Sequence, residues 1–224
     1  PRGSGKTTLL KMVTPEALEM WPQQRAALPA PNFSGIYVPI DVQLADILDS
    51  IRNADAPGDL REATLESVYG LHVFKCILAS LSWHFPSSRR RSKKAVVSPE
   101  TEARLIDDLA ALWSLSLRVP TVGELQLSLR RKQIRALEAW GRLAFLARRG
   151  RDFDVSELEV VAFDASMKAA VEVLSRSLEL RGSQRWALLF DELEVAPEYL
   201  QRLLLTYLRF SDETILFKVA ISPY

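Results

Sequence analysis

The sequence predicts an α/β fold: a parallel sheet flanked by helices, with a large all-helical insertion between its second strand and a later, acid-tipped strand. Three short apolar runs, at residues 33–41, 186–190 and 215–221, have the length and composition of buried parallel strands. About 140 residues separate the first two runs and have helical periodicity almost throughout, far more than a strand-helix-strand crossover needs. This excess predicts the insertion.

The chain opens with a glycine-rich segment, Pro1–Leu10, that matches the phosphate-binding pattern G-x-x-x-x-G-K-[ST] except that its first Gly would precede Pro1. In this pattern the backbone curls around a polyphosphate, Lys6 reaches the β- and γ-phosphates, and Thr7 offers a hydroxyl to Mg²⁺. The alternative is an ordinary turn with a solvated lysine. Because such a loop follows a strand, we expect a preceding segment or a partner chain to supply the first strand. The predicted nucleotide-binding residues are Gly3, Ser4, Gly5, Lys6, Thr7 and Thr8.

The apolar run at 186–190 ends in Asp191 and Glu192, which is typical of a buried strand with acids at its carboxyl end, the Walker B motif. In P-loop NTPases an aspartate here helps to hold Mg²⁺, and an acid beside it orients or deprotonates the attacking water. The alternative, a solvated strand end, is disfavoured because the glycine-rich loop precedes the acids in the expected order. We predict Asp191 and Thr7 as metal ligands and Glu192 as the catalytic base. The absence of an Asn-Lys-x-Asp segment weakly favours ATP over GTP.

Composition limits the classes of function. The 224 residues are 48% hydrophobic and 25% charged, as expected of a globular protein. Because 29 basic residues oppose 28 acidic ones, for a net charge of +1, only local clusters could attract nucleic acid. Cys76 is the single cysteine, which excludes an internal disulfide and fits a reducing compartment, by default the cytoplasm. The sequence has no run of about 18 uncharged apolar residues and no secretory signal, so we expect no membrane partner.

Proline and capping residues predict where helices begin and end. The first helix should stop near Val13, since a proline two residues later disfavours further helix, and Thr14 then has the position of an N-cap. Within the insertion, Ser98 precedes a helix start. Thr121–Glu124 forms a capping box that opens a long helix ending near Arg149.

The strand at 33–41 places Asp41 at its tip. If this strand lies beside the Walker B strand, Asp41 or Gln43 would face the nucleotide and hold Glu192 in a resting hydrogen bond. The favoured alternative is that Asp41 is the N-cap of the following helix.

Candidate metal ligands in the insertion are better explained as core residues. A helix at about 60–81 carries His72 and Cys76 on its apolar stripe, and His84 follows soon after. Zinc normally needs three or four ligands in a closed set, so we predict core packing instead. A later helix, beginning near residue 164, places Met167 on its apolar stripe, where a methionine is also a core residue.

Two basic clusters lie in the insertion. The segment Arg89–Lys94 holds five basic residues among serines, and Arg130–Arg151 holds eight against the single acid Glu138. Contact with nucleic acid is one hypothesis. The other is a solvated basic face that pairs with acids of the neighbouring helix. Those candidate acids are Glu100, Glu102, Asp107 and Asp108.

The order of P-loop, acidic pair, helix and a strand ending at Ser222 resembles the additional-strand P-loop ATPases, and within them the AAA+ superfamily. Residues 189–194 and 215–224 are most similar to origin-recognition-like AAA ATPases of bacteria and archaea, some of which are associated with anti-phage defence. The resemblance implies that Ser222 occupies the sensor-1 position and contacts the γ-phosphate or the water, with Lys6 and Glu192 as the other catalytic residues. The sequence departs from the AAA+ pattern in its long insertion and its serine at sensor 1, and it ends before any lid domain, sensor-2 arginine or arginine finger. We therefore expect efficient turnover to need missing parts or a partner.

We therefore predict three segments: residues 1–55 and 183–224 form the ATPase core, and residues 56–182 form the helical insertion. The predicted function is binding and hydrolysis of Mg-ATP that switches the conformation of a larger protein or assembly, with a homo- or hetero-oligomeric partner. One alternative is a STAND-like signalling module that holds nucleotide with little turnover. A third hypothesis, which the origin-recognition resemblance implies, is that the insertion is a nucleic-acid arm.

Overall fold

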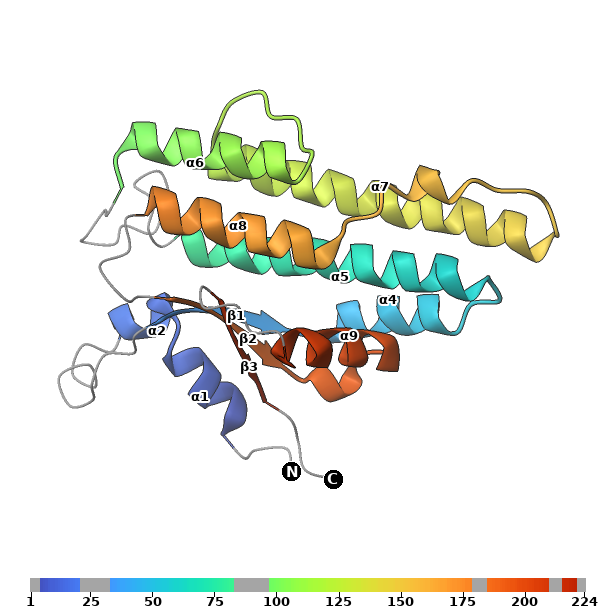
Figure 1. The fold of residues 1–224 in the computed structure, drawn as a ribbon, viewed down its shortest axis with the longest axis horizontal. Coiled ribbons are helices and arrows are strands. Elements are labelled where there is room, and N and C mark those ends of the chain that lie inside the picture. The colour runs from blue at the N-terminus through green and yellow to red at the C-terminus, as the bar shows by residue number, and fades with distance from the viewer. Residues whose placement is uncertain (1–4, 21–32, 83–96, 179–184, 210–214, 221–224) are drawn as a thin grey trace.

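In the part of the chain that the structure describes, three parallel strands form one sheet with helices around it (Figure 1), which confirms the predicted α/β class. The computed structural model describes residues 5–20, 33–82, 97–178, 185–209 and 215–220. The strands have the order β1 (Phe33–Pro39), β2 (Arg185–Asp191) and β3 (Ile215–Val219), and they coincide with the three predicted apolar runs.

Strand β2 lies at the centre of these three strands and is buried from its second residue to its last. It pairs with β1 from Phe33 opposite Arg185 to Pro39 opposite Asp191. The two strands therefore end at the same level, so groups that follow them meet at one edge of the sheet. Burial on both faces explains why β2 is a continuous apolar run rather than an alternating one.

The helices begin where their capping residues predict. Ser98 accepts a hydrogen bond from the Thr101 amide, and Thr121 accepts one from the Glu124 amide. The helices before the central strand are α1 (Lys6–Met12), α2 (Pro15–Met20), α4 (Val42–Arg52), α5 (Gly58–Leu81), α6 (Pro99–Leu112), α7 (Val122–Arg148), the 3₁₀ helix η1 (Val155–Leu158) and α8 (Phe163–Ser177). After it come the 3₁₀ helix η2 (Leu193–Val195) and α9 (Glu198–Arg209).

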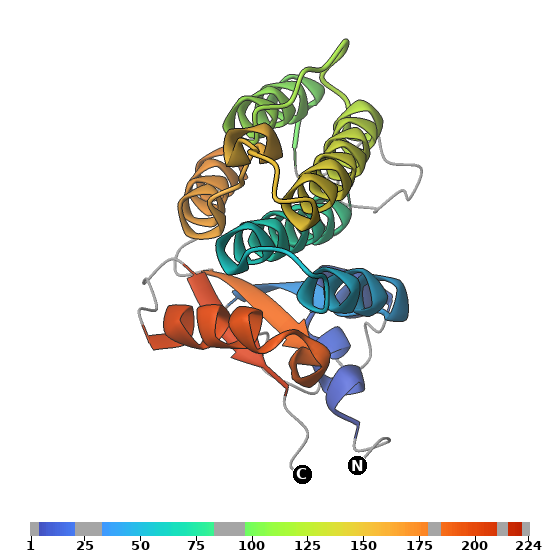
Figure 2. The same cartoon turned by 90° about the vertical axis from the view of Figure 1, so that its right-hand side faces the viewer.

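The helices between β1 and β2 form a bundle over one side of the sheet. Helix α5 lies against the sheet, and α6, α7 and α8 lie beyond it; α9 contacts α5, whereas α1 contacts β1 and β2 (Figures 1 and 2). Every described element between β1 and β2 is helical. The buried apolar side chains of bundle and sheet form one continuous cluster. The three-segment division of the chain stays a prediction.

The predicted core positions are confirmed for Met167 and His72, whereas Cys76 is half-buried and packs against the core. Met167 is 1% exposed, and His72 is buried with its Nε2 2.7 Å from the Pro39 carbonyl oxygen. Burial lowers the pKa of His72. Within the described ranges, no three His, Cys, Asp or Glu side chains come together as a metal site, and no helix is long and apolar enough to cross a bilayer. His84 lies outside those ranges.

Candidate nucleotide-binding site

Helix α1, which follows the glycine-rich loop, runs antiparallel to the strands. Its C-terminal neighbour Val13 lies over Gly35 in the first half of β1, and Lys11 lies over the Tyr37 ring, with Nζ 5.0 Å from the ring centroid. Because a helix rises about 1.5 Å per residue, Lys6 is displaced from Lys11 toward the carboxyl ends of the strands. Gly5 and Lys6, the described end of the glycine-rich segment, are thereby directed at the edge where β2 ends in its acidic pair.

Gly35 makes this close approach possible. A Cβ at residue 35 would lie 2.6 Å from the Val13 carbonyl oxygen and 2.7 Å from Leu189 Cδ1, closer than real Cβ contacts. We expect Gly35→Ala to lower the free energy of unfolding by about 1–3 kcal/mol, because backbone and a buried side chain must both shift. Gly141→Ala in α7 is the control, since a Cβ there meets nothing within 4 Å. Thermal melting of both variants is the measurement, and equal melting temperatures would contradict the packing argument.

The loop residues that the structure describes suit a phosphate cradle. Gly5 has φ +76°, a left-handed conformation that favours glycine, and a Cβ there would meet nothing within 4 Å. The first turn of α1 receives no side-chain cap from Gly5. Lys6 and Thr7 are half-buried, and Thr8 is exposed. Gly3 and Ser4 lie outside the described residues, so their roles stay predictions.

Asp191 is a buried carboxylate, 4% exposed, at the tip of β2. Its Oδ2 accepts a hydrogen bond of 2.8 Å from the Tyr37 hydroxyl, and its Oδ1 accepts one of 3.1 Å from the Glu192 amide. A carboxylate has about four lone-pair sites, so two of these remain for a metal ion or its water. Oxygen ligands of this kind, with the hydroxyl of Thr7, fit Mg²⁺. Burial, and next the bond to Asp191, raise the pKa of Tyr37 well above its usual value, so Tyr37 donates its proton.

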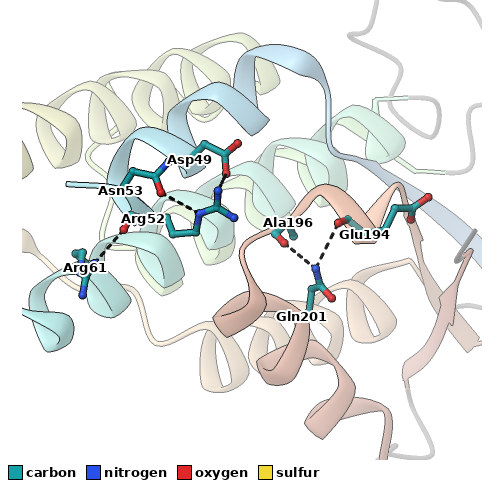
Figure 3. Close-up of polar contacts among 7 residues, drawn as sticks. All are labelled: Asp49, Arg52, Asn53, Arg61, Glu194, Ala196 and Gln201. Carbon is teal, nitrogen blue, oxygen red and sulfur yellow. Dashed lines mark hydrogen bonds and ion pairs between the residues drawn. The ribbon is translucent and has the colours of Figure 1, made fainter. Parts of the chain in front are cut away.

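Glu192, unlike Asp191, is exposed. Its backbone is left-handed, with φ +57°. The turn therefore separates one carboxylate inside the fold from one that is open to solvent. Gln201 of α9 holds the segment after the turn, donating from Nε2 to the carbonyl oxygens of Ala196 at 2.7 Å and Glu194 at 3.4 Å (Figure 3).

At the tip of β1, Asp41 caps helix α4, as the favoured alternative has it. Its Oδ1 accepts a hydrogen bond of 2.8 Å from the Leu44 amide, so this oxygen is engaged within its own helix rather than with Glu192. On the other side of β2, the Ala220 amide donates to the Phe190 carbonyl oxygen at 3.0 Å, which brings the end of the β3 segment next to the acidic pair. Ser222 lies outside the described residues, and its sensor role stays a prediction.

Two residues at this site were not predicted from the sequence. Tyr37 and Gly35 are ordinary strand residues until the register is known. The pairing of Tyr37 with Leu189 makes Asp191 its diagonal neighbour on the same face of the sheet. A tyrosine two residues before the end of the strand paired to Walker B is the only signal that the sequence offers.

Comparison with known proteins agrees with this geometry. A family model described as ORC-CDC6-like matches residues 1–224, the whole of the sequence. No significant match was found among curated proteins or among solved structures.

Proposed function

The chain belongs to the ORC-CDC6-like family of AAA+ P-loop NTPases, and we propose that it binds and hydrolyses Mg-ATP to switch the conformation of a larger assembly. One observation carries the proposal. Helix α1 is directed at the edge of the sheet where β2 presents a buried Asp191 and an exposed Glu192. The proposed phosphate-binding groups and the proposed base are thereby directed to the same edge of the sheet.

The chemistry follows from these groups. The backbone amides of the loop and Lys6 would neutralise the phosphate charge, and Thr7 and Asp191 would hold Mg²⁺, which would supply further charge neutralisation. Glu192 takes a proton from water as the water oxygen bonds to the γ-phosphorus. The bond from that phosphorus to the β–γ bridging oxygen breaks, and ADP leaves with the bonding electrons. Ser222, by the family resemblance, contacts the γ-phosphate or the water.

Isothermal titration with ATP and with GTP, each with and without Mg²⁺, tests the proposal. We expect ATP to bind more tightly with Mg²⁺ than with EDTA, and phosphate to be released slowly from the bound complex. Absence of binding by either nucleotide in a folded protein would contradict the proposal. Tighter binding of GTP than of ATP would show that the preferred nucleobase is guanine rather than adenine.

The route from this site to the rest of the molecule supports the switching part of the proposal. Glu66 of α5 joins two elements: its Oε1 accepts the Phe163 amide of α8 at 3.0 Å, and its Oε2 accepts the Tyr199 hydroxyl of α9 at 3.3 Å. The rings of Phe163 and Tyr207 lie 5.5 Å apart. Helix α9 begins a few residues after the Walker B turn. A movement of Glu192 could therefore shift α9 and, through Glu66, helices α5 and α8 of the bundle.

The basic segment of α7 supports a second part of the proposal, contact with a polyanion. Three of its cations have acidic partners: Arg131 with Glu124, Lys132 with Glu159, and Arg142 with Glu157. These acids belong to α7 itself and to the region of η1, not to helix α6. Lys132 is also buried and donates to the Trp113 carbonyl oxygen. Five further arginines of this segment are exposed: Arg130, Arg135, Arg148, Arg149 and Arg151. We call these five, together with Arg131 and Arg142, the α7 basic face.

We expect reversal of Arg130, Arg131 and Arg135 to Glu to weaken DNA or RNA binding and to flatten its salt dependence. Phosphate contacts release counterions, so the log–log slope should change by about 0.9 for each duplex phosphate that the variant no longer neutralises. Fluorescence anisotropy with duplex and single-stranded oligonucleotides over a salt series is the measurement.

The matched control reverses Arg52, Arg176 and Arg202, exposed arginines outside the α7 basic face. This control changes the net charge equally and should leave the slope close to that of the wild type. No binding at low salt by the wild type, together with a lowered melting temperature of the α7 variant, would discard the polyanion and leave a structural helix. The second cluster, Arg89–Lys94, lies outside the described residues and enters only as a prediction.

A further inference from the structure

The Tyr37 hydroxyl is the one side-chain donor that the described structure gives to Asp191. It comes from a neighbouring strand 154 positions earlier in the sequence, and its bond of 2.8 Å has the ordinary length of an O–H···O hydrogen bond. The other bond to this carboxylate, from the Glu192 amide, is local to the turn. Among these two bonds, only that of Tyr37 ties the orientation of the carboxylate to the rest of the sheet.

We propose that Tyr37 is a positioning residue for Mg²⁺ binding: its hydroxyl holds Asp191 Oδ2, so that the free lone pairs of the carboxylate face the P-loop. This inference rests on the proposed nucleotide function and adds a residue to it. The diagonal register fixes the arrangement, because Tyr37 pairs with Leu189 and Pro39 pairs with Asp191. A phenol is long enough to span that diagonal, and it is uncharged, so it orients the carboxylate without competing with a cation for its charge.

Tyr37 also contacts the helix of the P-loop. The Lys11 Nζ lies 5.0 Å from the centroid of its ring, within the range of a cation–π interaction. Lys11 and the loop lysine are on the same short helix. The ring thus lies between the element that binds phosphate and the carboxylate that holds the metal, and it sets their relative position from within the sheet.

The alternative is that Tyr37 merely satisfies a buried carboxylate. That role would affect folding stability and leave Mg²⁺ dependence unchanged. A positioning role affects the metal, because removal of a partner behind a metal ligand typically costs 10- to 100-fold in metal affinity. The two roles are therefore separable by titrating the metal rather than by measuring turnover.

The experiment is a Mg²⁺ titration of the binding of a fluorescent ATP analogue, with Tyr37→Phe compared with wild type. We expect the Mg²⁺ midpoint to rise by about 10-fold, with the affinity measured in EDTA unchanged. Tyr199→Phe is the matched control, since it removes the same atom from a bond to another carboxylate, Glu66. Its Mg²⁺ midpoint should stay at the wild-type value. Lys11→Met should shift the midpoint in the same direction as Tyr37→Phe by a smaller factor, and it reports on the site even if Tyr37→Phe folds poorly.

Each outcome is decisive. A wild-type Mg²⁺ midpoint in both Tyr37→Phe and Lys11→Met, with only the melting temperature changed, would overturn the positioning role while the proposed function stands. An equal rise in the Tyr199→Phe control would also overturn it, because the effect would then be general. Failure of the wild-type protein to bind the analogue at any Mg²⁺ concentration would instead overturn the proposed function and this inference with it.

Discussion

Lys6→Ala is expected to weaken ATP binding by about 10²-fold or more, while the protein stays folded. In the proposed site the lysine would make charge-assisted contacts to the β- and γ-phosphates, and hydrogen bonds to charged groups contribute about 1.5–3 kcal/mol each. Lys6 is the first residue of α1 and is half-buried, so alanine removes the cation without disturbing a packed core. Isothermal titration with Mg-ATP is the measurement, with circular dichroism to establish folding.

Lys75→Ala supplies the comparison for Lys6. Lys75 is an exposed lysine of α5, and its removal changes the net charge equally. We expect ATP affinity close to that of the wild type. An unchanged affinity in a folded Lys6→Ala variant would remove the basis for assigning the opening segment as a P-loop. An equal drop in affinity in both variants would point to an effect of net charge.

Local chemistry was sufficient to predict much of the fold. Helix starts at Ser98 and Thr121 depend on a hydroxyl and an amide three residues apart, so the signal is contained in a few neighbouring positions. Strand β2 was predictable because a strand buried on both faces must be apolar throughout. The acids at its end were conspicuous for the same reason, since two adjacent carboxylates contrast sharply with such a run.

Contacts that depend on register were not predictable. Whether Tyr37 reaches Asp191 is decided by how β1 and β2 align, and a shift of one residue would turn the phenol to the other face. The requirement for a glycine at residue 35 depends in the same way on where α1 crosses the sheet. Neither the strand register nor the position of α1 over the sheet can be predicted from a single sequence.

Partners of surface charges were predicted in part. The hypothesis that α7 cations pair with acids is supported for three of them, but the acids come from α7 and the η1 region, whose position depends on the turn after α7. Asp41 shows the opposite case. Its capping bond to the Leu44 amide spans three residues, so the N-cap alternative was the better supported one before the structure.

Glu192→Gln is expected to lower ATP hydrolysis by about 10²-fold or more while Mg-ATP still binds. Glutamine keeps the length of the side chain and removes the base. Because Glu192 is exposed and its amide, not its side chain, bonds to Asp191, the change should leave the buried carboxylate in place. Single-turnover phosphate release and isothermal titration of the same preparation measure the two effects separately.

Asp191→Asn provides the contrast that makes this prediction sharp. It removes a charge from the proposed metal site, so it should weaken the Mg²⁺ dependence of binding, whereas Glu192→Gln should leave that dependence intact. Neither substitution changes the bonds from Gln201 that hold the segment after the turn. If the turn were nevertheless disturbed, the melting temperatures of both variants would fall. Equal turnover in wild type and Glu192→Gln would contradict Glu192 as the base. It would leave Asp191 and the loop as a nucleotide-binding site whose water is activated by a group from a partner.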